Sequence, residues 1–145
     1  MTATQVPTLA DFEQALLNVR QVAFQTPVLH SNFLSNLVGH EVFLKAENLQ
    51  RMGAFKFRGA INALLQLSPE AARRGVLAYS SGNHAQAVAL SARILNIPAT
   101  LFMPHDASPA KLAATQGYGA KVIGYDRYSE DASALATTLA QVNGL

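Results

Sequence analysis

The feature that most constrains the fold is the regular alternation of short apolar runs with longer amphipathic segments after residue 40. The apolar runs predict strands and the amphipathic segments predict helices. The strands are expected at residues 41–46, 75–79, 99–103 and 121–124, and the helices at about 56–67, 84–95, 109–116 and 128–142. Because strands and helices that take turns with short links form right-handed crossovers, the pattern predicts an α/β fold. We expect a three-layer αβα arrangement around a mostly parallel sheet.

The first 40 residues follow a different pattern. Thr8 lies three residues before Asp11, which predicts a capping-box start for an amphipathic helix reaching about residue 22. Thr26 precedes a proline and is therefore expected in extended backbone. Residues 31–38 predict a short helix that ends at Gly39.

Composition excludes several classes of function. The chain has no cysteine, so disulfides and thiolate chemistry are excluded, and its four histidines lack metal-ligand spacing, so no metal site is expected. The net charge is +2 with scattered basic residues, which argues against nucleic-acid binding. No apolar run approaches the roughly 18 residues of a membrane span, and residues 1–20 do not resemble a signal peptide. We therefore expect a cytoplasmic protein that does not enter a membrane.

A loop of small polar residues is expected where the second strand of the pattern meets its helix. It contains Ser80, Ser81, Gly82, Asn83 and His84. Ligands of open parallel sheets bind at such carboxyl ends of strands, and a helix start offers unpaired N–H groups to a carboxylate or phosphate. The same residue types also form ordinary helix caps and turns. The loop alone leaves an anion site and a plain cap as alternatives.

A lysine between two phenylalanines is expected at the start of the preceding helix. Lys56 stands between Phe55 and Phe57 and is followed by Arg58. Partial burial and the helix dipole would favour the neutral, nucleophilic amine that a Schiff base requires. In the alternative interpretation the ammonium reaches solvent while its stem packs on the rings. Arg58 is interpreted as a surface or ion-pairing residue.

Taken together, the two loops resemble those of a known family. Residues 48–50 read NLQ, residues 53–60 read GAFKFRGA and residues 80–87 read SSGNHAQA. In this order and spacing they resemble the fold-type-II pyridoxal-phosphate enzymes, in the branch of threonine/serine dehydratases and serine racemases. Residues 26–28 and residues 104 and 108–111 also resemble that branch. The resemblance extends from about residue 12 to the last residue.

The resemblance implies a role for three residues toward pyridoxal 5'-phosphate. Lys56 would carry the cofactor through a Schiff base and act as the base that removes the α-proton of the substrate. Phe55 would pack beside the pyridine ring. Asn83 would donate a hydrogen bond to the phenolic oxygen of the ring.

The resemblance also implies a substrate site. Ser80, Ser81, Gly82, Asn83 and His84 would bind a small hydroxy-amino acid through its carboxylate. Ser81 would be the acid/base on the ring face opposite the lysine in a racemase, and would be idle in a dehydratase.

The activity implied is that of an ammonia-lyase, which converts threonine or serine into a 2-oxo acid and ammonia. Three alternatives stay open. The chain could belong to a serine or hydroxyaspartate racemase or dehydratase. It could be a non-catalytic fragment that needs a partner half. It could also be an anion-binding domain in which Lys56 is incidental.

The resemblance also implies a division of the chain. Residues 1–40 would be an amino-terminal segment that packs on a large domain, and residues 41–145 a small parallel α/β domain. The pattern ends on a helix that should lead into another strand, and the family's phosphate-binding glycine loop comes later. We therefore expect a truncated chain with little activity alone, and a homo-oligomer at full length.

Overall fold

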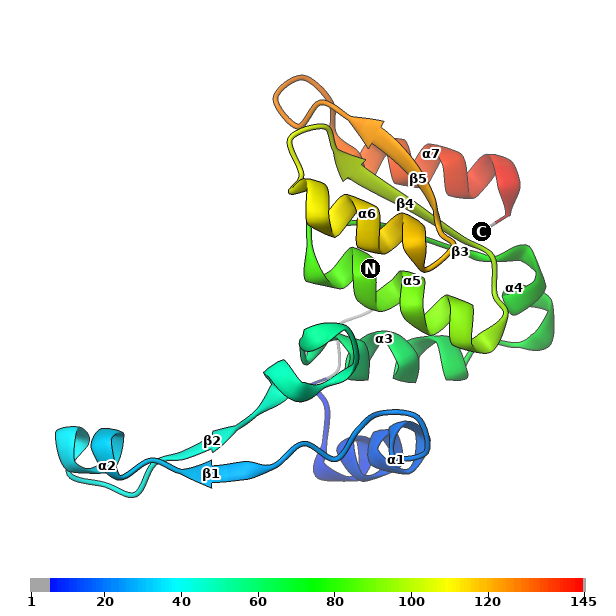
Figure 1. Cartoon of the computed structure of the whole chain (residues 1–145). Coiled ribbons are helices and arrows are strands. Elements are labelled where there is room, and N and C mark those ends of the chain that lie inside the picture. Colours follow the sequence, from blue (N-terminus) through cyan, green and yellow to red (C-terminus); the bar gives the residue numbers. More distant parts are fainter. Residues whose placement is uncertain (1–5, 145) are drawn as a thin grey trace.

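The computed structural model describes residues 6–144 and contains helices, two short 3-10 turns and strands in two sheets (Figure 1). The amino-terminal part comprises α1 (Leu9–Val19), β1 (Val28–His30), α2 (Asn32–Val38), β2 (Phe43–Lys45), η1 (Glu47–Leu49) and η2 (Arg51–Gly53). It is followed by α3 (Lys56–Leu65), α4 (Pro69–Arg74), β3 (Val76–Tyr79), α5 (Asn83–Leu95), β4 (Ala99–Pro104), α6 (Pro109–Gly117), β5 (Lys121–Tyr125) and α7 (Ala132–Asn143).

The larger sheet is parallel, with strand order β3-β4-β5. Successive side chains of the central strand β4 point to opposite faces. Leu101 and Met103 are almost fully buried in a core shared with α5, whereas Phe102 lies with Ile123 on the face where α7 packs. Helices therefore cover both faces, with α5 and α6 on one and α7 on the other (Figure 1). The predicted α/β class and parallel sheet are confirmed.

The prediction for residues 41–46 is wrong in one respect. We expected the first strand of the parallel sheet, but β2 pairs antiparallel with β1, with Leu44 opposite Leu29, in a separate two-stranded sheet. A local apolar run predicts a strand but not its neighbour, and β1 follows the extended Thr26-Pro27 step that supplies this neighbour. The pairing joins the two sides of the boundary at residue 40, and the division into a segment and a domain stays a prediction.

Helix boundaries follow capping side chains. The capping box of α1 is present, since Asp11 Oδ2 accepts from the Thr8 amide at 2.6 Å. Helix α3 ends earlier than predicted and the separate helix α4 follows, because Ser68 caps a new helix with proline at its first position. Helix α7 begins later than predicted because Asp131 caps it through the amides of residues 133 and 134.

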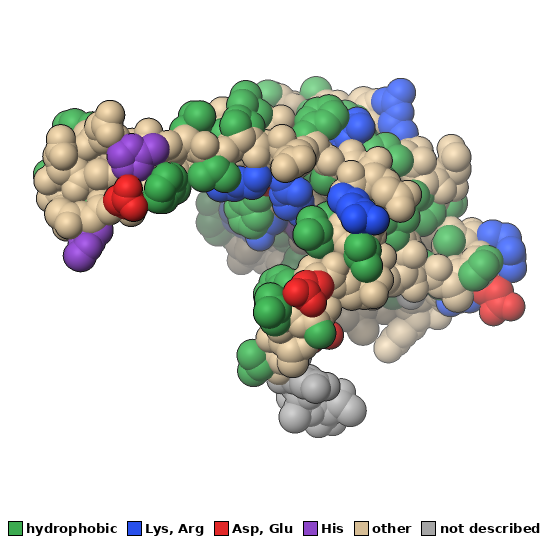
Figure 2. Space-filling model, turned by 90° about the horizontal axis from the view of Figure 1, so that it is seen from below, with side chains coloured by type: hydrophobic (Ala, Val, Ile, Leu, Met, Phe, Trp, Pro, Cys, Tyr) green, Lys and Arg blue, Asp and Glu red, His purple; other side chains and the backbone are tan. Residues whose placement is uncertain are grey.

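Strands β1 and β2 and helix α2 form an arm that projects from the parallel sheet and its helices (Figure 1). Apolar side chains lie exposed along this arm and on α1, as Figure 2 shows from below. They include Phe12, Leu16, Val28, Leu29, Phe33, Leu37, Phe43 and Leu44. Within residues 6–144 no helix combines the length and the apolar character needed to cross a lipid bilayer.

Candidate functional site

The two predicted loops lie at neighbouring helix starts. Lys56 is the first residue of α3 and Asn83 is the first residue of α5. These helices run side by side with their amino-terminal ends at the same side of the molecule (Figure 1). The fold thus brings together two chain segments that are separated by more than twenty residues in the sequence.

Lys56 is exposed, as in the interpretation in which its ammonium reaches solvent. Its Nζ atom lies 5.0 Å from the centroid of the Phe55 ring, and that ring is 59% exposed. Only Phe57 enters the core, where it is fully buried beside Val19 and Ile61. Because one of the two rings anchors the helix and the other stays at the surface, the amine remains accessible.

The pKa of His84 indicates that the loop before α5 and the start of α3 are close. The pKa of its imidazole is lowered by partial burial and, second, by the positive charge of Lys56. Both effects disfavour the imidazolium, so His84 is held in its neutral form at pH 7. The Lys56 ammonium is therefore close enough to affect a side chain in the first turn of α5.

The start of α5 has no side-chain cap. Gly82 occupies the cap position and donates its own amide to Ser80 Oγ at 3.2 Å. Ser80 is tied to the sheet, since its amide donates to the Phe102 carbonyl at 3.0 Å. Ser81 and Asn83 are exposed. An uncapped helix start presents free N–H groups and the positive end of the helix dipole, which is the geometry of an anion site.

A cavity of about 560 Å³ opens beside the same helix start. It lies between β3 and α7 and is lined by Leu77, Ala78, Tyr79, His84, Ala136, Thr137 and Ala140. His84 lines this cavity and Lys56 does not, so the amine and the cavity are separate features. Within residues 6–144 no three His, Asp or Glu side chains lie close enough together to hold a metal ion.

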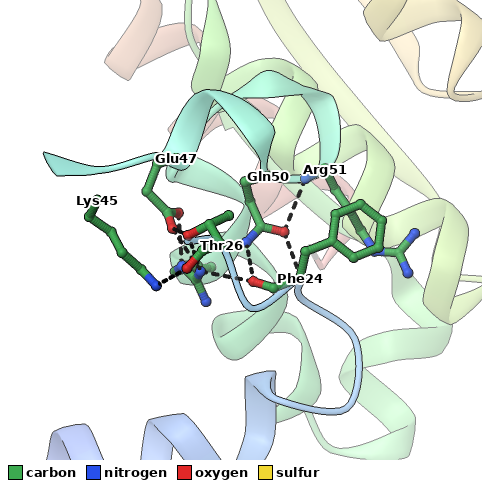
Figure 3. A network of polar contacts seen from close by, with 7 residues as sticks. Phe24, Thr26, Lys45, Glu47, Gln50 and Arg51 are labelled. Atoms are coloured by element: carbon green, nitrogen blue, oxygen red, sulfur yellow. Dashed lines mark hydrogen bonds and ion pairs between the residues drawn. The ribbon is translucent and has the colours of Figure 1, made fainter. Parts of the chain in front are cut away.

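Arg58, two residues after Lys56, forms an ion pair with a partner that the sequence analysis did not identify. Arg58 donates to Glu47 from Nε at 2.8 Å and from Nη2 at 2.7 Å, and the Thr26 hydroxyl also donates to Glu47 (Figure 3). The hydrogen bonds from Arg58 are the main cause that lowers the pKa of Glu47 to about 2. The sequence predicted Arg58 as a surface or ion-pairing residue, and the ion pair is confirmed. Nothing local in the sequence marks Glu47 as its partner.

Gln50 forms a second group of hydrogen bonds, which also ties residues 22–26 to the loop before α3. Its side-chain amide accepts from the Phe24 amide at 2.9 Å and donates to the Phe24 carbonyl at 2.8 Å (Figure 3). Arg51 Nε donates to the Val22 carbonyl at 2.7 Å. The backbone then turns through Met52 and Gly53, both in the left-handed region with φ of 55° and 75°. Residues 22–26 and the loop that leads to Lys56 are therefore tied together by side chains.

The comparisons with known proteins agree with this geometry. The family model described as "Pyridoxal-phosphate dependent enzyme" matches residues 19–145. The chain is 51% identical over 139 residues to L-threo-3-hydroxyaspartate ammonia-lyase of Saccharomyces cerevisiae, covering 96% of this chain and 43% of the relative. It is 52% identical over 140 residues to serine racemase of Schizosaccharomyces pombe, covering 97% of this chain and 43% of the relative.

A solved structure shows a similar relationship to this family. The T.th. threonine deaminase superposes with a TM-score of 0.80 at 40% identity, covering 95% of this chain and 43% of that one. The chain thus spans less than half the length of the relatives it matches. It belongs to the fold-type-II pyridoxal-phosphate-dependent enzymes, in the branch of threonine dehydratases, serine racemases and hydroxyaspartate ammonia-lyases.

Proposed function

We propose that this chain is the cofactor-lysine portion of an ammonia-lyase that acts on small hydroxy-amino acids, with Lys56 as the cofactor lysine. The observation that carries the proposal is the exposed Lys56 amine beside the uncapped start of α5. One group supplies a nucleophile and the other an anion site, and such an enzyme needs both. The family membership supports the use of pyridoxal 5'-phosphate.

The residues present fit the cofactor. The Lys56 amine is accessible for a covalent bond, the exposed Phe55 ring offers an apolar surface beside it, and Asn83 offers an exposed side-chain amide. In our proposal these three residues hold the cofactor. When bound, its ring withdraws electrons from the α-carbon of the substrate and makes the α-proton acidic.

The start of α5 would orient the substrate. Its free N–H groups, with Ser80, Ser81, Gly82 and His84, would bind the carboxylate, and the helix dipole would strengthen this contact. Fixing the carboxylate turns the α C–H bond toward the lysine, which is an orientation effect.

Two proton-transfer roles remain. Lys56 Nζ would take the α-proton and return it to the β-hydroxyl, which leaves as water, and a second water molecule would hydrolyse the dehydrated product to a 2-oxo acid and ammonia. The Ser81 hydroxyl is exposed and would serve as acid/base on the opposite face in a racemase, whereas a dehydratase would leave it idle.

A second candidate substrate has specific support. The identity to the Saccharomyces cerevisiae hydroxyaspartate ammonia-lyase is 51%, whereas it is 41% to the catabolic L-threonine dehydratase of Staphylococcus aureus. We therefore propose hydroxyaspartate beside threonine and serine. Serine racemization is the remaining alternative, with 52% identity to the Schizosaccharomyces pombe racemase. Because the chain spans 43% of these relatives, turnover is expected to need a complementary portion of the fold.

The proposal is tested by trapping the cofactor on the chain. The protein is incubated with pyridoxal 5'-phosphate, reduced with borohydride, and digested for peptide mass spectrometry. We expect label on Lys56 in excess over Lys45 and Lys121, and no label at position 56 in Lys56→Ala, whose fold is checked by circular dichroism. Equal labelling of all three lysines in the wild type would show that Lys56 is no more reactive than Lys45 and Lys121, and would contradict its assignment as the cofactor lysine.

A further inference from the structure

The Lys111 side chain lies directly on the loop that begins α5. A Cβ atom built on Gly82 would lie 3.1 Å from Lys111 Nζ, 3.6 Å from its Cδ and 3.8 Å from its Cε. Lys111 belongs to the first turn of α6, which packs against α5. Its amide donates to the Ser108 carbonyl at 3.0 Å, and its carbonyl accepts from Thr115 Oγ1 at 2.8 Å. The backbone that carries this ammonium is thus well held.

The Lys111 ammonium occupies the space next to the Cα atom of Gly82. Gly82, the cap residue of α5, has φ −159° and ψ −129° and is buried. A side chain there would press on the Lys111 ammonium, since 3.1 Å is closer than ordinary van der Waals contact. Gly82 leaves room for a cation to approach the peptide groups at the helix start.

The position of this cation is electrostatically unfavourable in the absence of an anion. A cation near a helix N-terminus is repelled by the positive end of the helix dipole. The ion pairs within residues 6–144 are Arg58 with Glu47 and Arg127 with Asp106. Asp106, five residues before Lys111, is thus occupied by Arg127 at 2.8 Å. No carboxylate of the described residues compensates Lys111.

We propose that Lys111 is a cationic binding residue of the substrate site, whose ammonium pairs with the carboxylate received by the start of α5. This inference rests on the proposed function only in taking the loop at residues 80–84 as the substrate site. An anion there meets the free N–H groups on one side and the ammonium on the other. It also offsets the repulsion between Lys111 and the helix dipole.

The test reads each lysine separately and needs no cofactor. The rate at which each lysine is acetylated is measured by peptide mass spectrometry in the presence of 3-hydroxypropionate. This ligand is serine without its amine, so it does not consume the acetylating reagent. Propane-1,3-diol, in which a neutral group replaces the carboxylate, is the uncharged control, inorganic phosphate is the competing anion, and all samples have the same ionic strength. We expect 3-hydroxypropionate to slow acetylation of Lys111 about threefold at twice its dissociation constant. The exposed Lys121 serves as the control and keeps its rate.

Variants provide a second measurement. Binding of 3-hydroxypropionate is followed through the amide resonance of Gly82, and Lys111→Gln is expected to weaken it about tenfold. Lys111→Arg should retain part of the affinity, and Lys121→Gln should retain all of it. The inference is overturned if Lys111→Gln binds as tightly as the wild type, if the diol protects equally, or if phosphate protects Lys111 better than the carboxylate.

The two proposals fail separately. Selective trapping of cofactor on Lys56 without protection of Lys111 would overturn the role of Lys111 and leave the proposed function standing. Protection of Lys111 without selective trapping on Lys56 would support the anion site and remove the cofactor chemistry.

Discussion

Glu47 is held ionised by a specific set of donors, one of which is Arg58, two residues after the cofactor-lysine candidate. Arg58 contacts both of its oxygens and the Thr26 hydroxyl adds a third hydrogen bond. The side chain of Glu47 is 17% exposed, so water screens this pair only in part. Removing one partner would leave a half-buried charge without compensation, which costs more than the loss of an exposed ion pair.

This pair predicts a stability difference that depends on pH. The pKa of Glu47 falls from 4.5 to about 2 on folding, so its stabilisation is complete above pH 4.5 and is lost as the pH falls toward 2. We expect Glu47→Gln to lose about 2 kcal/mol of unfolding free energy at pH 7. Urea unfolding at pH 7 and between pH 5 and 2 measures this difference, which should shrink across the acid range. Glu13→Gln, at an exposed position of α1, is the control; an equal loss in both variants at pH 7 would contradict the prediction.

Among the elements, helix α7 covers one face of the parallel sheet, and its first turn is capped by the side chain of Asp131. It packs on β3 and over Phe102 and Ile123, on the face opposite α5 and α6. Asp131 Oδ1 accepts from the amides of Ser133 at 2.8 Å and Ala134 at 3.3 Å. Loss of this cap would fray the first turn and open an apolar surface to water.

We expect Asp131→Ala to destabilise the protein by about 1 kcal/mol. The variant should also bind more of a hydrophobic dye than the wild type, because the sheet face under α7 becomes accessible. Asp131→Asn keeps a capping oxygen and should behave like the wild type. If Asn and Ala lower the unfolding midpoint equally, charge and not capping is the function of Asp131.

The molecule as a whole leaves much apolar surface uncovered. On α2, Phe33 is 77% exposed and Leu37 is 71% exposed, and β1 and β2 add further apolar side chains (Figure 2). Strands β3 and β5 are also the edges of the parallel sheet within the described residues. Contiguous apolar patches of this kind associate with another surface. The homo-oligomer and the complementary portion both stay predictions.

We expect the isolated chain to associate with increasing concentration. Phe33→Ser combined with Leu37→Ser should weaken self-association at least severalfold, because the arm loses its two most exposed large apolar side chains. Sedimentation velocity over a concentration series measures this. Tyr128→Ser changes an equally exposed aromatic residue away from the arm and should have no effect. A wild-type chain that sediments as a monomer throughout would contradict the prediction.

The sequence by itself determined the α/β class and most elements of the parallel part, but not the separate helix α4. Local caps such as Thr8 and Gly39 and the period of the apolar residues depend on neighbours in the chain, so they can be read without a structure. The two loops that carry Lys56 and residues 80–84 were found in this way, and their family is confirmed.

Only the tertiary structure decided which distant residues meet. It paired residues 43–45 with β1 instead of the parallel sheet, exposed Lys56, joined Glu47 to Arg58 and placed Lys111 on Gly82. Each of these contacts depends on how helices and strands pack across many residues of chain. Hydrophobic periodicity specifies the buried face of an element, but the neighbour on that face follows from the packing of the whole chain.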